Sequence, residues 1–228
     1  MSITNEREFY RAIAKHSLVH SSNNQLKILH DYYKFTMYRN PAERLFSAYR
    51  DKVEKYPMLG LQTTEPHFNW VRMDIYRYKY PEKFKEWREN GGREAINISF
   101  SDFIDYWLEE MGHKLTDHHF VPIFSICQPC SVRYHYYGKF SSLQRDAQVL
   151  LKHVGADLTV LKESYYQASG KISTELLAPK YYNLLSETQK GRIIRRLALD
   201  LLFYYKIFPE ERDAHKLTMS TDIDIEHY

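Results

Sequence analysis

Residues 34–53, KFTMYRNPAERLFSAYRDKV, decide the fold of this chain. Lys34–Arg39 is rich in aromatic and β-branched residues, which is typical of a β-strand. Asn40 can cap a helix, Pro41 suits the first helical position because its missing N–H costs nothing there, and Glu43 takes the third position. A helix over residues 42–55 is expected to follow, with an apolar stripe of Leu45, Phe46, Tyr49 and Val53. The segment predicts a strand, a tight turn and a helix.

Helical patterns dominate the rest of the chain. Apolar residues recur at helical spacing, or helix-start signals occur, in residues 6–19, 25–33, 99–111, 142–155 and 186–205. Residues 57–95 are interrupted by prolines and glycines and are interpreted as loop and irregular helix, and residues 121–137 as irregular with a strand tendency. Many helices with few strands predict an α/β fold with a small sheet.

Length and composition exclude several classes of protein. The chain has 228 residues, of which 43% are hydrophobic and 27% charged, so it is neither disordered nor of low complexity. The longest stretch without Asp, Glu, Lys or Arg is residues 118–132, which is too short for a transmembrane helix. The polar, acid-containing start MSITNERE does not resemble a signal peptide. One domain, or one domain with an appendage, is expected.

Charge is distributed unevenly. Residues 209–228 contain six acids and two bases, a net charge of −4, so residues 1–208 carry +7 of the total of +3. A basic body with a short acidic tail favours polyanionic partners such as nucleic acid, a membrane surface or an acidic polysaccharide. Solubility alone is the other explanation. Basic and aromatic residues are dispersed without a known nucleic-acid-binding module, so nucleic acid is not the partner we expect.

A phosphate-binding arrangement is indicated at the start of the helix after Arg39. A guanidinium group leaving a strand end can bind a phosphate through two parallel hydrogen bonds. The following helix offers N–H groups and the positive end of its dipole to an anion. Ser47 lies three residues after Arg44 and therefore shares its helix face. The alternative is an ion pair between Arg39 and an acid such as Glu43.

The two cysteines, Cys127 and Cys130, form a C-x-x-C motif downstream of His118 and His119. Such a motif is compatible with half of a zinc site, a redox pair or a local disulfide. The histidines lie at an awkward spacing for zinc, and the residues after Cys130 are poor helix formers, unlike those of a thioredoxin-type motif. A structural disulfide is therefore preferred, and no metal is predicted. A disulfide would place the domain in an oxidising compartment.

Several of these segments, in order, resemble the Golgi carbohydrate sulfotransferases, the group that contains the chondroitin and dermatan 4-O-sulfotransferases. The similar blocks are KFTMYRNPAERLFSAYRDKV (34–53), HFVPIFSICQPC (119–130), YHYYGKF (134–140) with Asp146-Ala147, and DLLFYY (200–205). The resemblance implies a nucleotide-binding fold with a small, mainly parallel sheet flanked by helices. It also implies a single domain over 1–208, with a variable insert at 57–95 and an acidic tail at 209–228.

The resemblance further implies an enzyme that transfers a sulfuryl group from 3′-phosphoadenosine-5′-phosphosulfate (PAPS) to a sugar hydroxyl of a glycan or proteoglycan chain such as chondroitin or dermatan. Arg39 and Ser47 would hold the 3′-phosphate of the donor, and the residues between them, including Asn40, Pro41 and Arg44, would shape the turn. His119 is the candidate base, because imidazole accepts a proton near neutral pH; a packed structural histidine is the alternative.

The chain departs from the family's usual residues at Ala42, Phe120 and Ser141, and more seriously ahead of the region that begins at Lys34. Family members precede this region with a membrane anchor and a phosphosulfate loop that contains Pro-Lys, Thr and Trp, whereas residues 1–33 contain neither Pro nor Trp. The sequence therefore predicts a chain that lacks both the anchor and the loop. The family places its members in the Golgi lumen or membrane. The alternative function is an inactive sulfotransferase-fold protein that binds polyanionic glycans.

Overall fold

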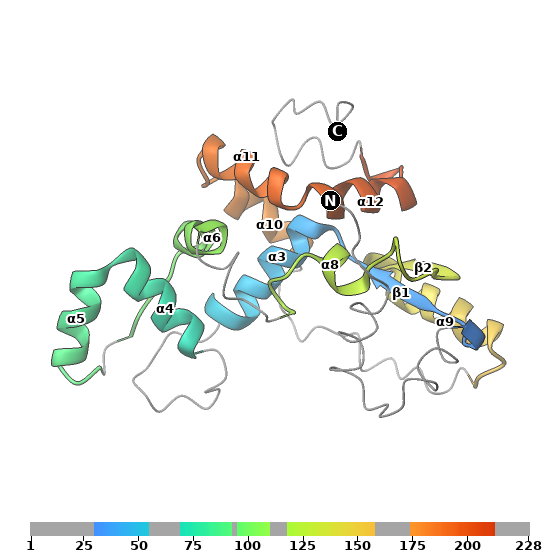
Figure 1. The fold of residues 1–228 in the computed structure, drawn as a ribbon, viewed down its shortest axis with the longest axis horizontal. Coiled ribbons are helices and arrows are strands. Elements are labelled where there is room, and N and C mark those ends of the chain that lie inside the picture. Colours follow the sequence, from blue (N-terminus) through green and yellow to red (C-terminus); the bar gives the residue numbers. More distant parts are fainter. Residues whose placement is uncertain (1–29, 55–68, 93–94, 110–117, 158–173, 213–228) are drawn as a thin grey trace. The chain divides into compact units, whose positions relative to one another are not determined.

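The computed structural model describes residues 30–54, 69–92, 95–109, 118–157 and 174–212, which Figure 1 draws in colour. These residues belong to two compact units. Unit 1 comprises the described residues up to Tyr38 and those from Phe124 to Asp157, and unit 2 comprises the remainder.

Unit 1 is built on two parallel strands, β1 (Phe35–Tyr38) and β2 (Tyr136–Lys139), which lie side by side in Figure 1. The register pairs Phe35 with Tyr136 and Tyr38 with Lys139. A 3₁₀ turn (Phe140–Ser142) leads into helix α9 (Leu143–His153), which packs against β2. The short helix α8 (Ile123–Cys127) precedes β2 in the chain. The predicted strand and the small parallel sheet are confirmed.

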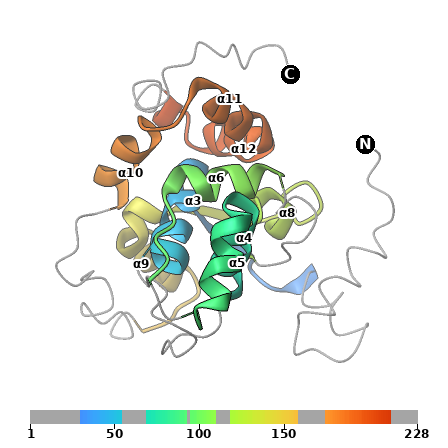
Figure 2. The same cartoon turned by 90° about the vertical axis from the view of Figure 1, so that its left-hand side faces the viewer.

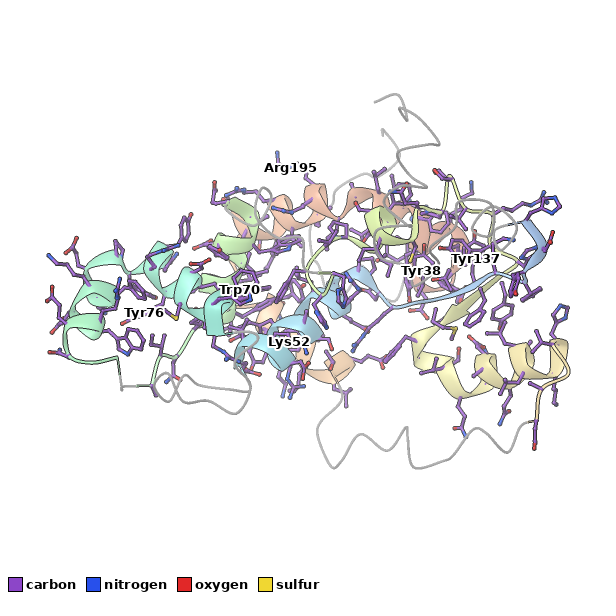
Figure 3. All side chains as sticks on the ribbon, turned by 60° about the horizontal axis from the view of Figure 1, so that its bottom comes forward. Tyr38, Lys52, Trp70, Tyr76, Tyr137 and Arg195 are labelled. Carbon is purple, nitrogen blue, oxygen red and sulfur yellow. The ribbon has the colours of Figure 1, made fainter. Side chains whose placement is uncertain are left out.

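The two strands approach each other closely at Gly138. A Cβ atom at this position would lie 2.4 Å from Sδ of Met37, the residue opposite it in the register, and 3.2 Å from the Tyr136 ring. The missing side chain of Gly138 therefore leaves room for Met37 over the strand pair. At the end of the pair the rings of Tyr38 and Tyr137 lie 6.2 Å apart between centroids. Both residues are labelled in Figure 3.

Unit 2 is helical. Its helices are α3 (Pro41–Tyr49), α4 (Asn69–Lys79), α5 (Pro81–Glu89), α6 (Phe100–Glu109), α10 (Thr174–Tyr182), α11 (Glu187–Arg196) and α12 (Ala198–Ile207). Helix α3 packs against α10 and α12, while α6 packs against α4 and α11, and Figure 2 shows this group of helices from the side. The last turn of the α3 segment is a π-helix, Arg50–Glu54.

Aromatic side chains hold the centre of unit 2 together. Phe46 of α3 is fully buried and meets the edge of Phe100 of α6 at 5.4 Å and the ring of Tyr181 of α10 at 4.6 Å. Tyr49 packs on Phe100 and Phe103 at 5.1 and 5.4 Å, and its hydroxyl donates to a buried backbone carbonyl. Such ring pairs add to the free energy gained by burying apolar surface. The predicted apolar stripe of α3 is buried throughout.

Residues 57–95 are more regular than predicted, because α4 and α5 occupy residues 69–89. Val71 and Ile75 are fully buried, one turn apart, as in an ordinary amphipathic helix. Arg72 between them is also buried and donates to the carbonyl oxygens of Val53 (2.9 Å) and the residue before it (2.6 Å). Because the charged Arg72 lies on the core side of α4, the residues that are buried in this helix do not form a purely apolar pattern in the sequence.

Other helix boundaries also differ from the prediction. The helix expected over 186–205 is broken at the buried Leu197 into α11 and α12, because this residue leaves helical geometry (φ −93°, ψ 7°). The segment 121–137 contains helix α8 before its strand begins at Tyr136. The helix of 99–111 is confirmed as α6, and that of 142–155 as α9.

Several predictions are left open. The helix at 6–19 and most of that at 25–33 lie outside the described residues, and the domain boundaries at 208 and 209 stay predictions. Among the described helices, none combines the length and the apolar character that crossing a bilayer requires.

Candidate active site

The N-terminus of α3 is capped from within the chain. Asn40 is buried, and its side-chain oxygen accepts hydrogen bonds from the backbone N–H groups of Ala42 (2.9 Å) and Glu43 (3.2 Å). Pro41 has no N–H, and the N–H of Arg44 donates to the carbonyl of Asn40 at 2.9 Å. The cap predicted for Asn40 and Pro41 is confirmed. The amides expected to receive an anion are already used, so an anion bound here must be held by side chains.

Arg39 precedes this cap and forms an ion pair with Glu43. Its Nε lies 3.6 Å from the Glu43 carboxylate, and the two side chains are only 18% and 20% exposed. Burial lowers the pKa of Arg39, and the negative charges of Glu43 and Glu175 partly offset this effect. The ion pair that the sequence left as an alternative is therefore present. A phosphate at Arg39 would have to compete with the Glu43 carboxylate.

Ser47 lies on α3, eight residues after Arg39, and is half-buried between the buried Phe46 and Ala48. The structure places Arg39 and Ser47 in the same unit, at the start and in the middle of one helical segment. Their joint binding of a 3′-phosphate stays a prediction.

Arg44 contacts the segment that carries the candidate base. One guanidinium nitrogen donates to the carbonyl oxygen of Val121 at 2.7 Å, and the other donates to that of His118. These two carbonyls flank His119 in the chain. Arg44 therefore links α3 to the backbone on both sides of the predicted base.

Residues 118–123, the His119 segment, are also held by two helices besides α3. The indole N–H of Trp107 in α6 donates to the Phe120 carbonyl at 3.0 Å, and both residues are buried. The Asp200 carboxylate of α12 accepts the backbone N–H of Ile123 at 2.8 Å and is only 1% exposed. Three helices thus fix the backbone on both sides of His119, whose ring lies 4.3 Å from that of His118 between centroids and is tilted by 31° against it.

Trp107 and Asp200 are residues of this site that sequence reasoning did not assign. Arg196 of α11 lies 4.4 Å above the Trp107 ring and donates to its backbone carbonyl at 2.6 Å, which fixes the indole. Only Asp200 has a signal in the sequence, since it stands in the apolar run LALDLL (197–202). An acid in such a run is expected to be buried, and a buried acid needs a hydrogen-bond or charged partner.

The disulfide predicted between Cys127 and Cys130 is not formed, and both cysteines are free thiols in unit 1. Helix α8 ends at Cys127, and Gln128 then adopts a left-handed conformation with φ 47°. The Cys127 sulfur lies 3.8 Å from the Thr36 hydroxyl of β1, whereas Cys130 is exposed. This turn sends the two thiols into different surroundings. The part of the chain that the structure describes contains no group of three metal-ligating side chains.

The geometry defines a helical unit in which an arginine–serine motif and a rigidly held histidine segment share one core. A family model described as the sulfotransferase family matches residues 2–206, and this chain belongs to that family. The predicted family is thereby confirmed.

The curated relatives are named carbohydrate sulfotransferases. Carbohydrate sulfotransferase 11 of Danio rerio is 28% identical over 192 residues, which is 81% of this chain and 49% of that protein. Carbohydrate sulfotransferase 10 of Rattus norvegicus is 34% identical over 139 residues, 58% of this chain and 35% of that protein. Carbohydrate sulfotransferase 14 of Homo sapiens is 31% identical over 130 residues, 56% and 30% respectively. This chain therefore spans less than half of the length of these relatives. No solved structure matches it significantly.

Proposed function

We propose that this chain takes part in transferring a sulfuryl group from PAPS to a sugar hydroxyl of a glycan chain, with chondroitin and dermatan as the acceptor class. The observation that carries the proposal is the family match over residues 2–206, which includes the Arg39–Ser47 motif and the His119 segment. The names of the relatives support a carbohydrate acceptor. The Golgi lumen or membrane is the proposed location.

Arg39 and Ser47 are the proposed ligands of the 3′-phosphate of the donor. The guanidinium would supply charge-assisted hydrogen bonds, and the Ser47 hydroxyl would donate one more. Asn40 and Pro41 contribute indirectly, because the buried cap sets the direction in which α3 leaves Arg39.

His119 is the proposed general base. The acceptor oxygen attacks the sulfur of PAPS and forms an S–O bond, and the bond from sulfur to the bridging phosphate oxygen breaks. The proton of the acceptor hydroxyl passes to the imidazole, and 3′-phosphoadenosine-5′-phosphate leaves. A neutral imidazole can take this role near neutral pH.

The test is transfer of ³⁵S-sulfate from labelled PAPS to desulfated chondroitin and dermatan by the purified chain, together with calorimetric binding of 3′-phosphoadenosine-5′-phosphate. We expect labelled polysaccharide and saturable nucleotide binding. His119→Ala should abolish transfer and leave nucleotide affinity unchanged. Absence of nucleotide binding by the wild-type chain would refute the proposal.

A second candidate function is binding of polyanionic glycans without catalysis. The ion pair between Arg39 and Glu43 and the occupied amides of α3 favour it, because both reduce what the motif offers to a nucleotide phosphate. This candidate predicts retention on a chondroitin or heparin column without any transfer of label.

A further inference from the structure

The hydrogen bonds of Arg44 are the feature of unit 2 that its predicted role does not explain. The sequence places it in the donor motif, but its two terminal nitrogens donate to the carbonyls of His118 and Val121, 74 and 77 residues further along the chain. A planar guanidinium matches two acceptors at fixed spacing, which a lysine cannot do with one ammonium group. Turning Arg44 toward a nucleotide would leave both carbonyls without these donors.

The carbonyls that Arg44 binds are three residues apart, and His119 lies between them. Phe120, also between them, is buried, so its backbone has little freedom to move. Trp107 binds the Phe120 carbonyl and Asp200 binds the Ile123 amide, and both side chains are almost completely buried. Of these three side chains, only Arg44 comes from α3, the helix that also carries Ser47.

We propose that Arg44 is a positioning residue that holds the His119 segment on α3, and that it is not a ligand of the donor. This assignment rests on the proposed function. Arg44 positions the base, while Arg39 and Ser47 bind the nucleotide. Trp107 and Asp200 support the same segment from α6 and α12. A small misplacement of a general base costs a large part of the rate, so loosening this segment lowers turnover.

The experiment compares the wild-type chain of 228 residues with Arg44→Met, which keeps the apolar stem and removes both donors. Arg44→Lys tests partial rescue, and Trp107→Phe removes one hydrogen bond to the same segment while keeping an aromatic ring. Arg77→Met is the matched control, because Arg77 is an exposed arginine that pairs with Asp74 on its own helix, α4. Three quantities are measured: hydrogen exchange of residues 118–123, affinity for 3′-phosphoadenosine-5′-phosphate, and kcat.

For Arg44→Met we expect exchange in residues 118–123 to accelerate at least fivefold and kcat to fall at least tenfold. Nucleotide affinity should stay within twofold of wild type. Arg44→Lys should lie between the two proteins, Trp107→Phe should show a weaker form of the same pattern, and Arg77→Met should match wild type.

Loss of nucleotide affinity in Arg44→Met, or unchanged exchange in residues 118–123, would overturn the proposal. If Arg44→Met does not fold, Arg44→Lys and Trp107→Phe decide by the same criteria. A wild-type chain that binds no nucleotide would refute the proposed function instead. Hydrogen exchange is measured without nucleotide. It therefore decides whether Arg44 holds the His119 segment even if the wild-type chain binds no nucleotide.

Discussion

At the scale of single residues, Arg39 is the proposed ligand that would bring a positive charge to the donor phosphate. Its half-buried guanidinium follows β1 directly, and a charge-assisted hydrogen bond to phosphate contributes about 1.5–3 kcal/mol. Arg39→Ala should therefore weaken binding of 3′-phosphoadenosine-5′-phosphate by about 2 kcal/mol, or roughly 30-fold, in calorimetry. Arg77→Ala, a change at an exposed arginine of α4, is the control. Equal affinities of wild type and Arg39→Ala would remove Arg39 from the site.

Glu43 would repel a phosphate bound at Arg39. Its carboxylate lies 3.6 Å from the Arg39 Nε, so a phosphate arriving there meets a negative charge. Glu43→Gln removes this charge and should tighten nucleotide binding severalfold at pH 7, with a smaller gain at high salt because screening weakens the repulsion in the wild type. Titrations at about 50 and 500 mM salt measure both effects. Weaker binding by Glu43→Gln would mean that Glu43 orients Arg39 instead of competing for it.

At the scale of elements, the Asn40 cap stabilises the start of α3. Asn40 is 4% exposed and accepts two backbone N–H groups that would otherwise be buried without a partner. Asn40→Ala should lower the free energy of unfolding by about 1–2 kcal/mol, as expected for a lost N-cap. Asn40→Ser keeps a capping oxygen and should recover most of the loss. Thermal unfolding of the three proteins checks the order wild type, Ser, Ala.

The turn from β2 into α9 depends on the ionised form of Asp146. Burial raises the pKa of this carboxyl, but hydrogen bonds from the Lys139 N–H (2.8 Å), Ser142 (2.9 Å) and Arg145 (3.2 Å) outweigh it and hold the pKa below its usual value. A lowered pKa in the folded state stabilises the protein above about pH 4, where the unfolded chain is also ionised. This contribution is lost as the pH falls through the lower, folded-state value.

Asp146→Asn should therefore open the β2–α9 turn more readily than wild type at pH 7, by about 1–2 kcal/mol. The difference should shrink as the pH falls below about 4, because the carboxyl of the opened turn is protonated first and that of the closed turn only at its lower pKa. Hydrogen exchange of the Lys139 amide, followed from pH 7 to pH 3 and corrected for intrinsic rates, measures the opening free energy. A difference that stays constant over this range would contradict the assigned role of the charge.

Elements with local signals were predictable from the sequence, and those fixed by distant contacts were not. The start of α3 is determined by neighbours in the chain, Asn40 and Pro41, and was predicted correctly. The break at Leu197 was not, because the apolar spacing continues across it. The partners of Arg44 were equally inaccessible, because they are backbone carbonyls more than seventy residues away, and any residue type provides a carbonyl.

At the scale of the whole molecule, the uneven distribution of charge predicts how the chain meets an acidic glycan. Residues 1–208 carry a net charge of +7 and residues 209–228 carry −4. Sulfated polysaccharides are polyanions, so the basic body should attract them and the acidic tail should oppose that attraction. Because both forces are long-range interactions between charges in solution, salt should weaken both.

Neutralising three tail acids in the chain of 228 residues, Asp222→Asn, Asp224→Asn and Glu226→Gln, raises the net charge from +3 to +6. We expect this protein to elute from a heparin or chondroitin column at higher salt than wild type, because less negative charge opposes the basic body. A matched triple change of Lys83, Lys85 and Arg88 to Gln, all exposed on α5, lowers the net charge to 0 and should elute earlier. Elution of all three proteins at one salt concentration would show that retention depends on a local site, and the glycan contact would then have to be sought among the residues near His119.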